Sequence, residues 1–289
     1  VGVSIINFSL MHLAPGGPFD MESLMSNQNR QALIEHYQLD KPLWEQYVNY
    51  MTKALQGDFG QSFRYRNQDV GAIILSRFAV SVQLGLAAMA VALLLGIRLG
   101  VQAAVKRNTW SDRLGMFAST VGYSVPNFVT SMLLILVLGL TLNLFPVGGW
   151  GTPQQVVLPA IALGLPWAAL IARLSRASML DELSQPYILV ARAKGARRFR
   201  IVVRHVLRNA LRPLVTVVGI LTAEMITGSF VIETIFGIPG LGQYFITSIL
   251  ASDYPMIMGA LVISTVLVIV GNIVADIAYG ILDPRITHD

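Results

Sequence analysis

Apolar residues along the chain are gathered into long stretches that are interrupted by few charges. A membrane-spanning helix needs about 20 apolar residues, and five internal stretches approach or exceed that length. They are residues 78–105, 114–147, 156–172, 213–232 and 255–275. We interpret the apolar start, residues 1–14, as a first membrane helix whose beginning precedes Val1, rather than as the remnant of a signal peptide. The pattern therefore predicts an all-α integral membrane protein with six transmembrane helices.

Two regions do not follow the simple pattern of spans. Residues 114–147 contain Pro126, which we expect to kink or break the second internal span. Residues 15–76 hold helix-like stretches at 29–37 and 43–55 and more aromatic residues than a disordered tail would carry. We interpret 15–76 as a structured cap segment between the first two helices, followed by a transmembrane core at 77–289.

Composition supports a chain that is solvated mainly by lipid. Hydrophobic residues make up 54% of the sequence and charged residues 13%, whereas soluble domains carry about 25% charged residues. The mean hydropathy is +0.60. The net charge of +5 is explained by membrane topology, because the basic residues are concentrated in one loop.

That loop lies between the fourth and fifth predicted spans. It contains ten of the 21 Lys and Arg residues, namely Arg173, Arg176, Arg192, Lys194, Arg197, Arg198, Arg200, Arg204, Arg208 and Arg212. Lys106, Arg107 and Arg113 lie in or beside the loop between the second and third spans. The opposite loops, residues 143–155 and 233–254, contain no Lys or Arg. The positive-inside rule then places both termini in the cytoplasm and residues 15–76 on the extracytoplasmic side.

Several kinds of chemistry are excluded or unsupported. The chain has no cysteine, and its four histidines are far apart and share no ligand spacing. We therefore predict no metal site. No nucleophile–base pair occurs within one span, so no catalytic residue is predicted. The sequence G-x-x-x-x-G-K-[ST] is absent, so the chain lacks the usual loop for nucleotide phosphates.

The most informative motif lies within the basic loop, at Ala191-Arg-Ala-Lys-Gly195. The small residues Ala191, Ala193 and Gly195 permit close approach of another surface. Pro186 suits the start of a helix and Gly195 suits a C-cap, so we expect a short helix followed by a turn. The residues alone support docking to a partner and attachment to anionic lipid headgroups about equally.

This motif, together with Leu207-Arg-Asn-Ala-Leu-Arg-Pro213, resembles the EAA loop of binding-protein-dependent ABC permeases. The acidic residue of the general motif would fall at Leu189, a departure that peptide-type permeases share. Further blocks resemble the dipeptide/oligopeptide permease subfamily, most closely its oligopeptide B-type subunit. They are Leu13-Ala-Pro-Gly-Gly-Pro-Phe19, Gly57-Asp-Phe-Gly-Gln-Ser-Phe63, the block at residues 228–242, Asp253-Tyr-Pro255 and the ending at residues 276–286.

The resemblance implies a permease subunit of an ATP-driven importer, whose residues 181–212 form a cytoplasmic coupling loop. The implied partners are a second homologous permease, two ATPase subunits or domains and an extracytoplasmic solute-binding protein. The chain itself needs no cofactor, because ATP and Mg²⁺ belong to the ATPase. Oligopeptides are the implied substrate, with dipeptides, glutathione, nickel chelates and some sugars as alternatives. An ion-coupled secondary transporter and a non-transporting scaffold remain as other classes.

Three groups of candidate site residues follow. The residues expected to contact the ATPase are Ala191, Ala193, Lys194, Gly195 and Arg198. Polar residues within spans are costly and often functional, and the pore or gate candidates are Glu224, Ser229, Glu233, Asn272 and Asp276. For Glu233 and Asp276, which lie in family-like blocks, a structural role is favoured over ligand contact. Pro239, Gly240 and Gly242 are expected in an external loop near a short re-entrant or surface helix.

Overall fold

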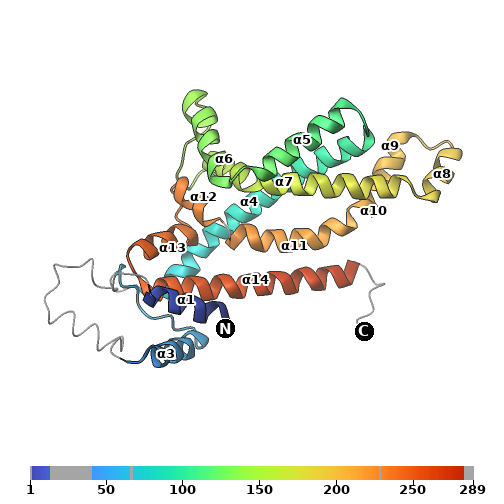
Figure 1. Cartoon of the computed structure of the whole chain (residues 1–289). Coiled ribbons are helices and arrows are strands. Elements are labelled where there is room, and N and C mark those ends of the chain that lie inside the picture. The colour runs from blue at the N-terminus through green and yellow to red at the C-terminus, as the bar shows by residue number, and fades with distance from the viewer. Residues whose placement is uncertain (1, 14–40, 66–67, 228, 283–289) are drawn as a thin grey trace. The chain divides into compact units, whose positions relative to one another are not determined.

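A computed structural model describes residues 2–13, 41–65, 68–227 and 229–282 of the chain (Figure 1). Every regular element in these ranges is helical, apart from an isolated bridge between Gln61 and Asp69. The predicted helix at 29–37 and most of the block that begins at Leu13 lie outside the described residues. The chain divides into two compact units, residues 1–80 with 239–266 and residues 81–238 with 267–289.

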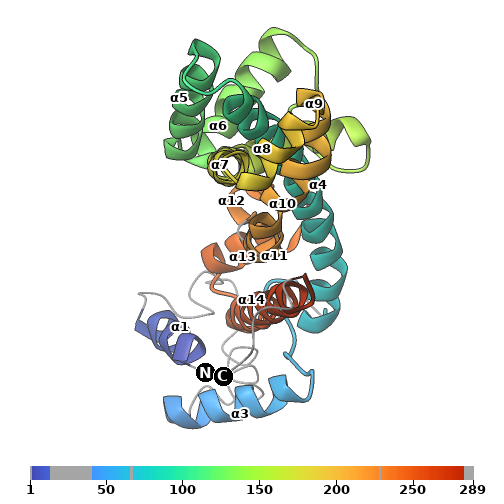
Figure 2. The ribbon, with the colours of Figure 1, turned by 90° about the vertical axis from the view of Figure 1, so that its right-hand side faces the viewer.

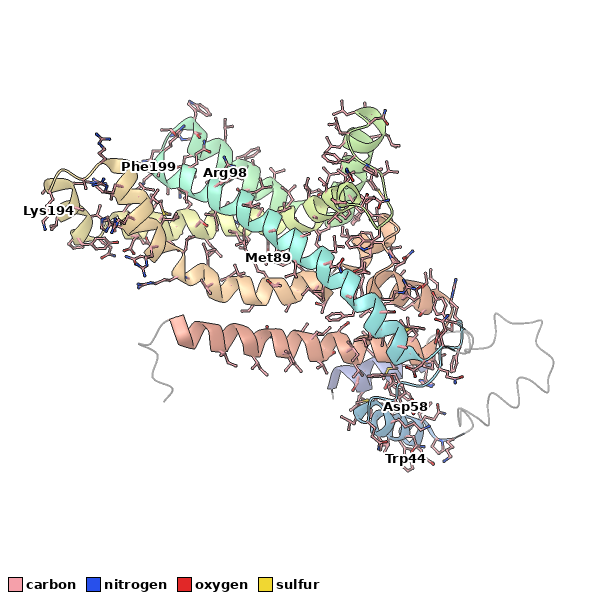
Figure 3. All side chains as sticks on the ribbon, turned by 180° about the vertical axis from the view of Figure 1, so that it is seen from behind. Trp44, Asp58, Met89, Arg98, Lys194 and Phe199 are labelled. Atoms are coloured by element: carbon pink, nitrogen blue, oxygen red, sulfur yellow. The ribbon has the colours of Figure 1, made fainter. Side chains whose placement is uncertain are left out.

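The first unit contains α1 (Gly2–Leu13), α3 (Leu43–Leu55), α13 (Leu241–Leu250) and the first parts of α4 (Val70–Val105) and α14 (Tyr254–Leu282). Its apolar core joins residues of α3, α4, α13 and α14, with Phe59, Val70 and Met256 among its buried members. The predicted helix at 43–55 is confirmed with the same bounds. Figure 3 shows Trp44 on this helix and Asp58 in the loop after it.

The second unit is built around α7 (Pro153–Leu183). The capping box of Thr152 and Gln155, with Pro153 at the first turn, explains where α7 starts. Helices α5 (Trp110–Ser124), α6 (Asn127–Leu134) and α11 (Arg212–Thr227) pack against it. Figure 2 looks almost along α7 and shows α5 beside it. The remaining elements are a π-helical turn at Ile135–Thr141, the loop helices described below, α12 (Phe230–Ile235) and the end of α14.

Small residues bring the backbones of α4 and α7 into contact. A methyl group added at Gly96 would lie 2.7 Å from the Ala168 carbonyl oxygen, and one added at Gly100 would lie 2.5 Å from that of Ala172. On the α7 side, a methyl group at Gly164 would lie 2.5 Å from the Ala88 carbonyl oxygen. Gly96 and Gly100 form a G-x-x-x-G pattern, which permits such close packing between membrane helices.

The helices confirm the membrane prediction and revise its boundaries. Within the described residues, Val70–Val105, Pro153–Leu183 and Tyr254–Ile273 are each long and apolar enough to span a bilayer, and two bent pairs raise the number to five. One pair, Trp110–Ser124 with Asn127–Thr141, is bent by 106°. The break expected at Pro126 is therefore confirmed, and it is a sharp turn rather than a kink. The sixth span and the position of the termini stay predictions.

Candidate functional site: the basic loop and its supports

The basic loop is defined from here on as residues 181–212, because Arg173 and Arg176 lie within α7. It begins in the last turn of α7 and carries α8 (Pro186–Ala193). Pro186 occupies the first turn of α8, as expected. The helix ends in a Schellman motif, in which the Gly195 N–H donates to the Arg192 carbonyl and the Ala196 N–H donates to the Ala191 carbonyl. Gly195 has a φ of 76°, which confirms its predicted place at the C-terminus of the short helix.

One face of α8 is fixed to its own subunit. Ile188 is fully buried in an apolar cluster with Ala104 of α4 and Met179 of α7. The other buried members come from the segment that follows α8, namely Ile201, Val202, Val206 and Ala210. This segment comprises α9 (Arg198–Arg200), a π-helical turn at Ile201–Val206 and α10 (Leu207–Ala210). The cluster therefore packs α8 against the ends of two long helices.

The opposite face of α8 is apolar and exposed. Leu189 is 64% exposed and Val190 54%. Leu189 is the position at which the general motif would have an acid, so an exposed leucine stands there instead. Phe199, in α9, is 78% exposed, and Figure 3 labels both Phe199 and Lys194 in this loop.

The five residues expected to contact the ATPase do not share one environment. Ala193, Lys194 and Gly195 are exposed, as a contact surface requires. Ala191 is half-buried and packs against the apolar cluster, so its small size serves packing within the subunit. Arg198 lies on α9.

Three polar side chains form a ring at the base of the loop. The Tyr187 hydroxyl donates to Glu182 Oε1, and the Asn209 amide donates to the same oxygen over 3.1 Å. The Asn209 amide also donates to the Tyr187 hydroxyl over 3.1 Å. Burial, and then the hydrogen bond to Glu182, raise the pKa of Tyr187. Reasoning from the sequence missed this ring, although Asn209 lies in one of the family-like blocks.

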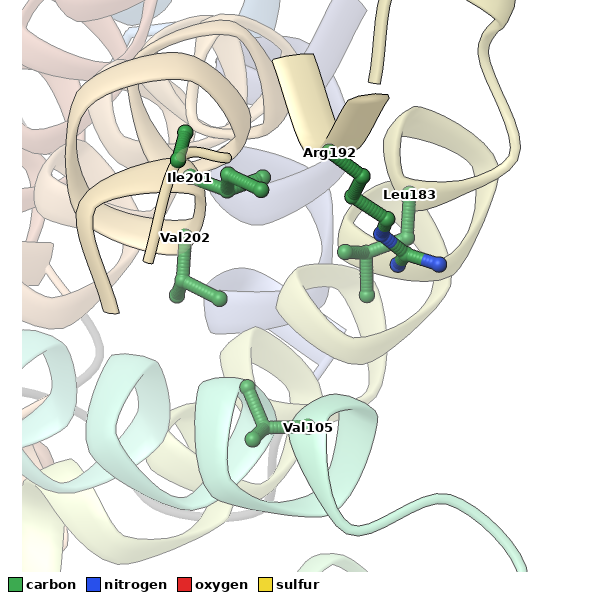
Figure 4. Close-up of a pocket in the computed structure, with 6 residues that line it drawn as sticks. Val105, Leu183, Arg192, Ile201 and Val202 are labelled. Carbon is green, nitrogen blue, oxygen red and sulfur yellow. The ribbon is translucent and has the colours of Figure 1, made fainter. Parts of the chain in front are cut away.

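A cavity of about 460 Å³ lies beside α8 (Figure 4). Its walls include Val105 at the end of α4, Leu183 at the end of α7, and Ile201 and Val202 beyond α8. Arg192 supplies the charged group among these mainly apolar side chains. The cavity thus lies between the C-terminal part of α8 and the helix ends that support it.

A buried ion pair joins α5 to α7 on the α8 side of the unit. Arg176 Nε donates to Asp112 Oδ1 over 2.6 Å, and Arg176 Nη2 donates to Oδ2 over 2.8 Å. Asp112 is only 4% exposed and also accepts a hydrogen bond from the Asn108 N–H. Nearby, the Arg173 guanidinium lies 4.8 Å from the centre of the Tyr123 ring. Two of the ten basic residues are therefore held by α5.

The pore or gate candidates fall into different positions. Glu224 on α11 and Asn272 on α14 have exposed side chains. Ser229 and Glu233 are fully buried, and the Ser229 hydroxyl donates to Glu233 Oε1 over 2.5 Å. This contact joins Glu233 to the N-cap residue of its own helix, α12. Asp276 lies on α14.

The described part of the next family-like block, residues 229–242, forms α12, a turn and the start of α13. Gly237, with a φ of 61°, ends α12 in another Schellman motif, in which the Ile238 N–H donates to the Glu233 carbonyl. In the first unit, Gly240 is the N-cap of α13, a short apolar helix of 10 residues. Gly240 and Gly242 are buried and Pro239 is half-buried.

A second polar cluster lies in the first unit, around Asp253. This carboxylate is fully buried and accepts hydrogen bonds from the Ser62 hydroxyl, from the Phe63 N–H over 3.1 Å and from the Arg64 N–H over 3.3 Å. It also caps α14 through the Met256 N–H at 3.3 Å. Two of the family-like blocks, at residues 57–63 and 253–255, therefore meet in space.

Long apolar helices, sharp breaks and a basic loop that carries a packed helix indicate a multi-pass membrane protein. Residues 72–288 match the family described as "Binding-protein-dependent transport system inner membrane component". The chain belongs to this family of inner membrane permease components of ABC transporters.

Similar proteins cover almost the whole chain. The chain is 44% identical over 284 residues to the dipeptide transport system permease protein DppB of Bacillus subtilis, an alignment that covers 98% of this chain and 92% of that protein. It is 39% identical over 285 residues to the oligopeptide transport system permease protein OppB of Escherichia coli K12, with 98% and 93% covered.

Solved structures share the fold at lower identity. A chain of the methionine ABC transporter MetNI, in an inward-facing conformation, matches with a TM-score of 0.62 and 19% identity. The match covers 73% of this chain and 96% of that chain. This similarity supports the helical arrangement.

Proposed function

We propose that this chain is one permease subunit of an ATP-driven importer and forms half of the path by which oligopeptides cross the membrane. The similar permeases named for dipeptide and oligopeptide transport support a peptide substrate. Dipeptides, glutathione or nickel chelates are the alternative cargo of the same machine. The charge asymmetry of the loops supports six spans, with both termini and the basic loop in the cytoplasm and the segment after the first span outside.

The observation that carries this proposal is the reach of α7. The helix has 31 residues and is therefore about 46 Å long, whereas the hydrocarbon core is about 30 Å thick. Its apolar part ends before Arg173, so residues 173–183 continue for about 16 Å beyond the hydrocarbon core. Figures 1 and 3 show the loop with α8 beyond the last turns of α7.

This geometry favours a protein partner over a lipid anchor. A helix attached to lipid headgroups lies at the plane of the membrane, but α8 is carried away from that plane by α7. Its exposed apolar residues, Leu189 and Val190, then face the aqueous side. An exposed apolar surface in water is a contact site for another protein. We therefore assign this face, with Ala193, Lys194, Gly195 and the α9 residue Arg198 beside it, to the ATPase.

The proposed assembly contains a homologous second permease, two ATPase subunits or domains, and an extracytoplasmic solute-binding protein. ATP and Mg²⁺ are bound by the ATPase, because this sequence has no phosphate-binding loop of the G-x-x-x-x-G-K-[ST] type. ATP binding closes the ATPase pair and displaces α8, and the spans shift between inward- and outward-facing states. Both states must lie close in energy for nucleotide and substrate to switch them.

The path itself is assigned to the exposed polar residues of the spans. Glu224 and Asn272 expose polar side chains on helices that are mostly apolar. Such groups face a water-filled path or a partner subunit rather than lipid. The short helix α13, with Pro239, Gly240 and Gly242 before it and at its start, is proposed to lie near the external opening.

The test of this proposal is Leu189→Glu in the assembled transporter. We expect normal membrane insertion, loss of ATPase subunits on purification of the permease, and loss of peptide uptake in vesicles supplied with ATP but no ion gradient. The control is Leu55→Glu, which makes the same change at an exposed leucine in α3 and should leave the ATPase bound. Retention of the ATPase and full uptake by Leu189→Glu would contradict the docking role. Uptake by the unmodified protein that required an ion gradient would favour a secondary transporter.

A further inference from the structure

The ring of Glu182, Tyr187 and Asn209 joins the two ends of the basic loop. Glu182 lies in the last turn of α7, just before the chain enters α8. Tyr187 is the second residue of α8, and Asn209 lies in α10, from which the chain continues into α11. The loop thus leaves α7 and returns toward α11 through one set of hydrogen bonds.

Each hydrogen bond in the ring has a consistent donor and acceptor. The tyrosine hydroxyl uses its proton for Glu182 and accepts one proton of the Asn209 amide. The second amide proton is donated to the same carboxylate oxygen. Removal of any one side chain therefore breaks two of the three contacts, so the ring acts as a unit.

The apolar cluster around Ile188 does not fix the position of α8 as the ring does. Apolar packing is non-directional, and the cavity of about 460 Å³ beside Arg192 leaves α8 room to shift over its supports. Hydrogen bonds depend on distance and angle, so the ring fixes the start of α8 relative to α7 and α10.

We propose that Glu182, Tyr187 and Asn209 are positioning residues that pass the movement of α8 to α7 and α11 together. This inference rests on the proposed function, in which an ATPase displaces α8. With the ring closed, α8 moves both helices as one body. With the ring open, α8 shifts into the cavity beside it. Part of its displacement is then not passed to α7 and α11.

The test is Tyr187→Phe in the complete transporter, reconstituted in vesicles with its ATPase and binding protein. The change keeps the aromatic ring but removes the hydroxyl that makes two of the three contacts. We expect normal assembly and ATP hydrolysis, with peptides transported per ATP reduced about fivefold. This is the factor for one ordinary hydrogen bond, and the two exposed contacts of the hydroxyl together are expected to contribute about that much. Tyr123→Phe is the matched control, since the Tyr123 ring contacts Arg173 outside this loop.

A second pair of variants separates the ring from general stability. Glu182→Gln keeps a side-chain oxygen that accepts hydrogen bonds, whereas Glu182→Ala removes it. We expect transport per ATP to be partly preserved in the first and to fall in the second to the level of Tyr187→Phe. Equal ratios in all variants and the wild type would overturn the proposal. Failure of Tyr187→Phe to assemble would also overturn it, because the ring would then be needed for docking.

The outcome for Leu189→Glu keeps the two proposals distinguishable. If Leu189→Glu releases the ATPase while Tyr187→Phe leaves the transport ratio unchanged, the docking role stands and the transmission role of the ring is wrong. If Leu189→Glu has no effect on docking or uptake, α8 is not the ATPase contact and both proposals are wrong.

Discussion

Two carboxylates, Asp253 and Glu182, each accept hydrogen bonds from more than one segment of the chain, but they are held in different ways. Asp253 is fully buried and accepts hydrogen bonds from one hydroxyl and three backbone N–H groups. Glu182 is half-buried, and two side chains share one of its oxygens.

The difference indicates different tasks. Backbone donors cannot rotate away, and a buried donor that loses its acceptor is costly, so the loop at residues 62–64 stays attached to the start of α14. Side-chain donors at a partly exposed site can separate and meet water at lower cost. We therefore expect the hydrogen bonds of the Asp253 cluster to stay formed. Those of the Glu182 ring can break and re-form at lower cost.

The largest effect is expected from Asp253→Ala. The change leaves four donors without their acceptor, two of them on the buried residues Ser62 and Met256. We therefore expect the free energy of unfolding to fall by roughly 3 kcal/mol or more, since each buried donor costs about 1–3 kcal/mol. A lower midpoint of thermal unfolding and faster protease cleavage near residues 57–65 would measure it. Asp253→Asn should be milder, because its amide oxygen still accepts.

Asp58→Ala is the matched control for this prediction. Asp58 is exposed, lies in the same block and accepts one hydrogen bond, from the Gly60 N–H. Its loss should change stability by less than about 0.5 kcal/mol. Equal effects of Asp253→Ala and Asp58→Ala would remove the distinction between a buried carboxylate and an exposed one.

A smaller loss of unfolding free energy is expected from Asp112→Ala. This variant tests whether a buried carboxylate in the second unit also stabilises the fold through its hydrogen bonds. The change removes both contacts of Arg176 and the acceptor of the Asn108 N–H. Breaking a fully buried pair costs about 3–5 kcal/mol, and the partial exposure of Arg176 reduces this to roughly 2 kcal/mol. The midpoint of thermal unfolding measures this cost. Asp181→Ala, at an exposed position on α7, is the control, and equal midpoints for the two variants would contradict the expectation.

The smallest free-energy cost is expected for substitutions of Gly195, which would change only how favourable the backbone conformation is. A Cβ added to this residue would have no atom within 4 Å, but the φ of 76° is unfavourable for alanine. Gly195→Ala should cost about 1 kcal/mol, and Gly195→Asn less, because asparagine tolerates this conformation. Retention of the ATPase by both variants under increasing salt measures the cost. A greater loss in Gly195→Asn would show that space, rather than conformation, limits this position.

Local signals in the sequence predicted local structure well. Residues 43–55, the break at Pro126 and the C-terminus of α8 at Gly195 all depend on neighbouring residues, and the structure confirms them. The apolar stretch at 156–172 lies within α7, and the helix continues through Arg173 and Arg176 to Leu183. The contacts of these two arginines with Tyr123 and Asp112 of α5 were not predictable from the sequence.

Contacts between distant residues were not predictable from the sequence. Ser62 and Asp253 are separated by 191 positions, and their pairing depends on how the helices return. Glu182 and Asn209 are closer in sequence, yet the ring exists only because α8 and α10 pack against the end of α7. The family-like blocks include Ser62, Asp253 and Asn209, but the resemblance does not show which atoms are in contact.

The contact between α4 and α7 also has a consequence for biosynthesis. Gly96 and Gly100 touch residues of α7 that lie about 70 positions later in the chain. At roughly 5–20 residues per second, a ribosome needs several seconds to produce those residues after Gly96 and Gly100 have been made. The bent pair of helices at residues 110–141 is translated during this delay, so α4 can pair with α7 only after the intervening segment has been made.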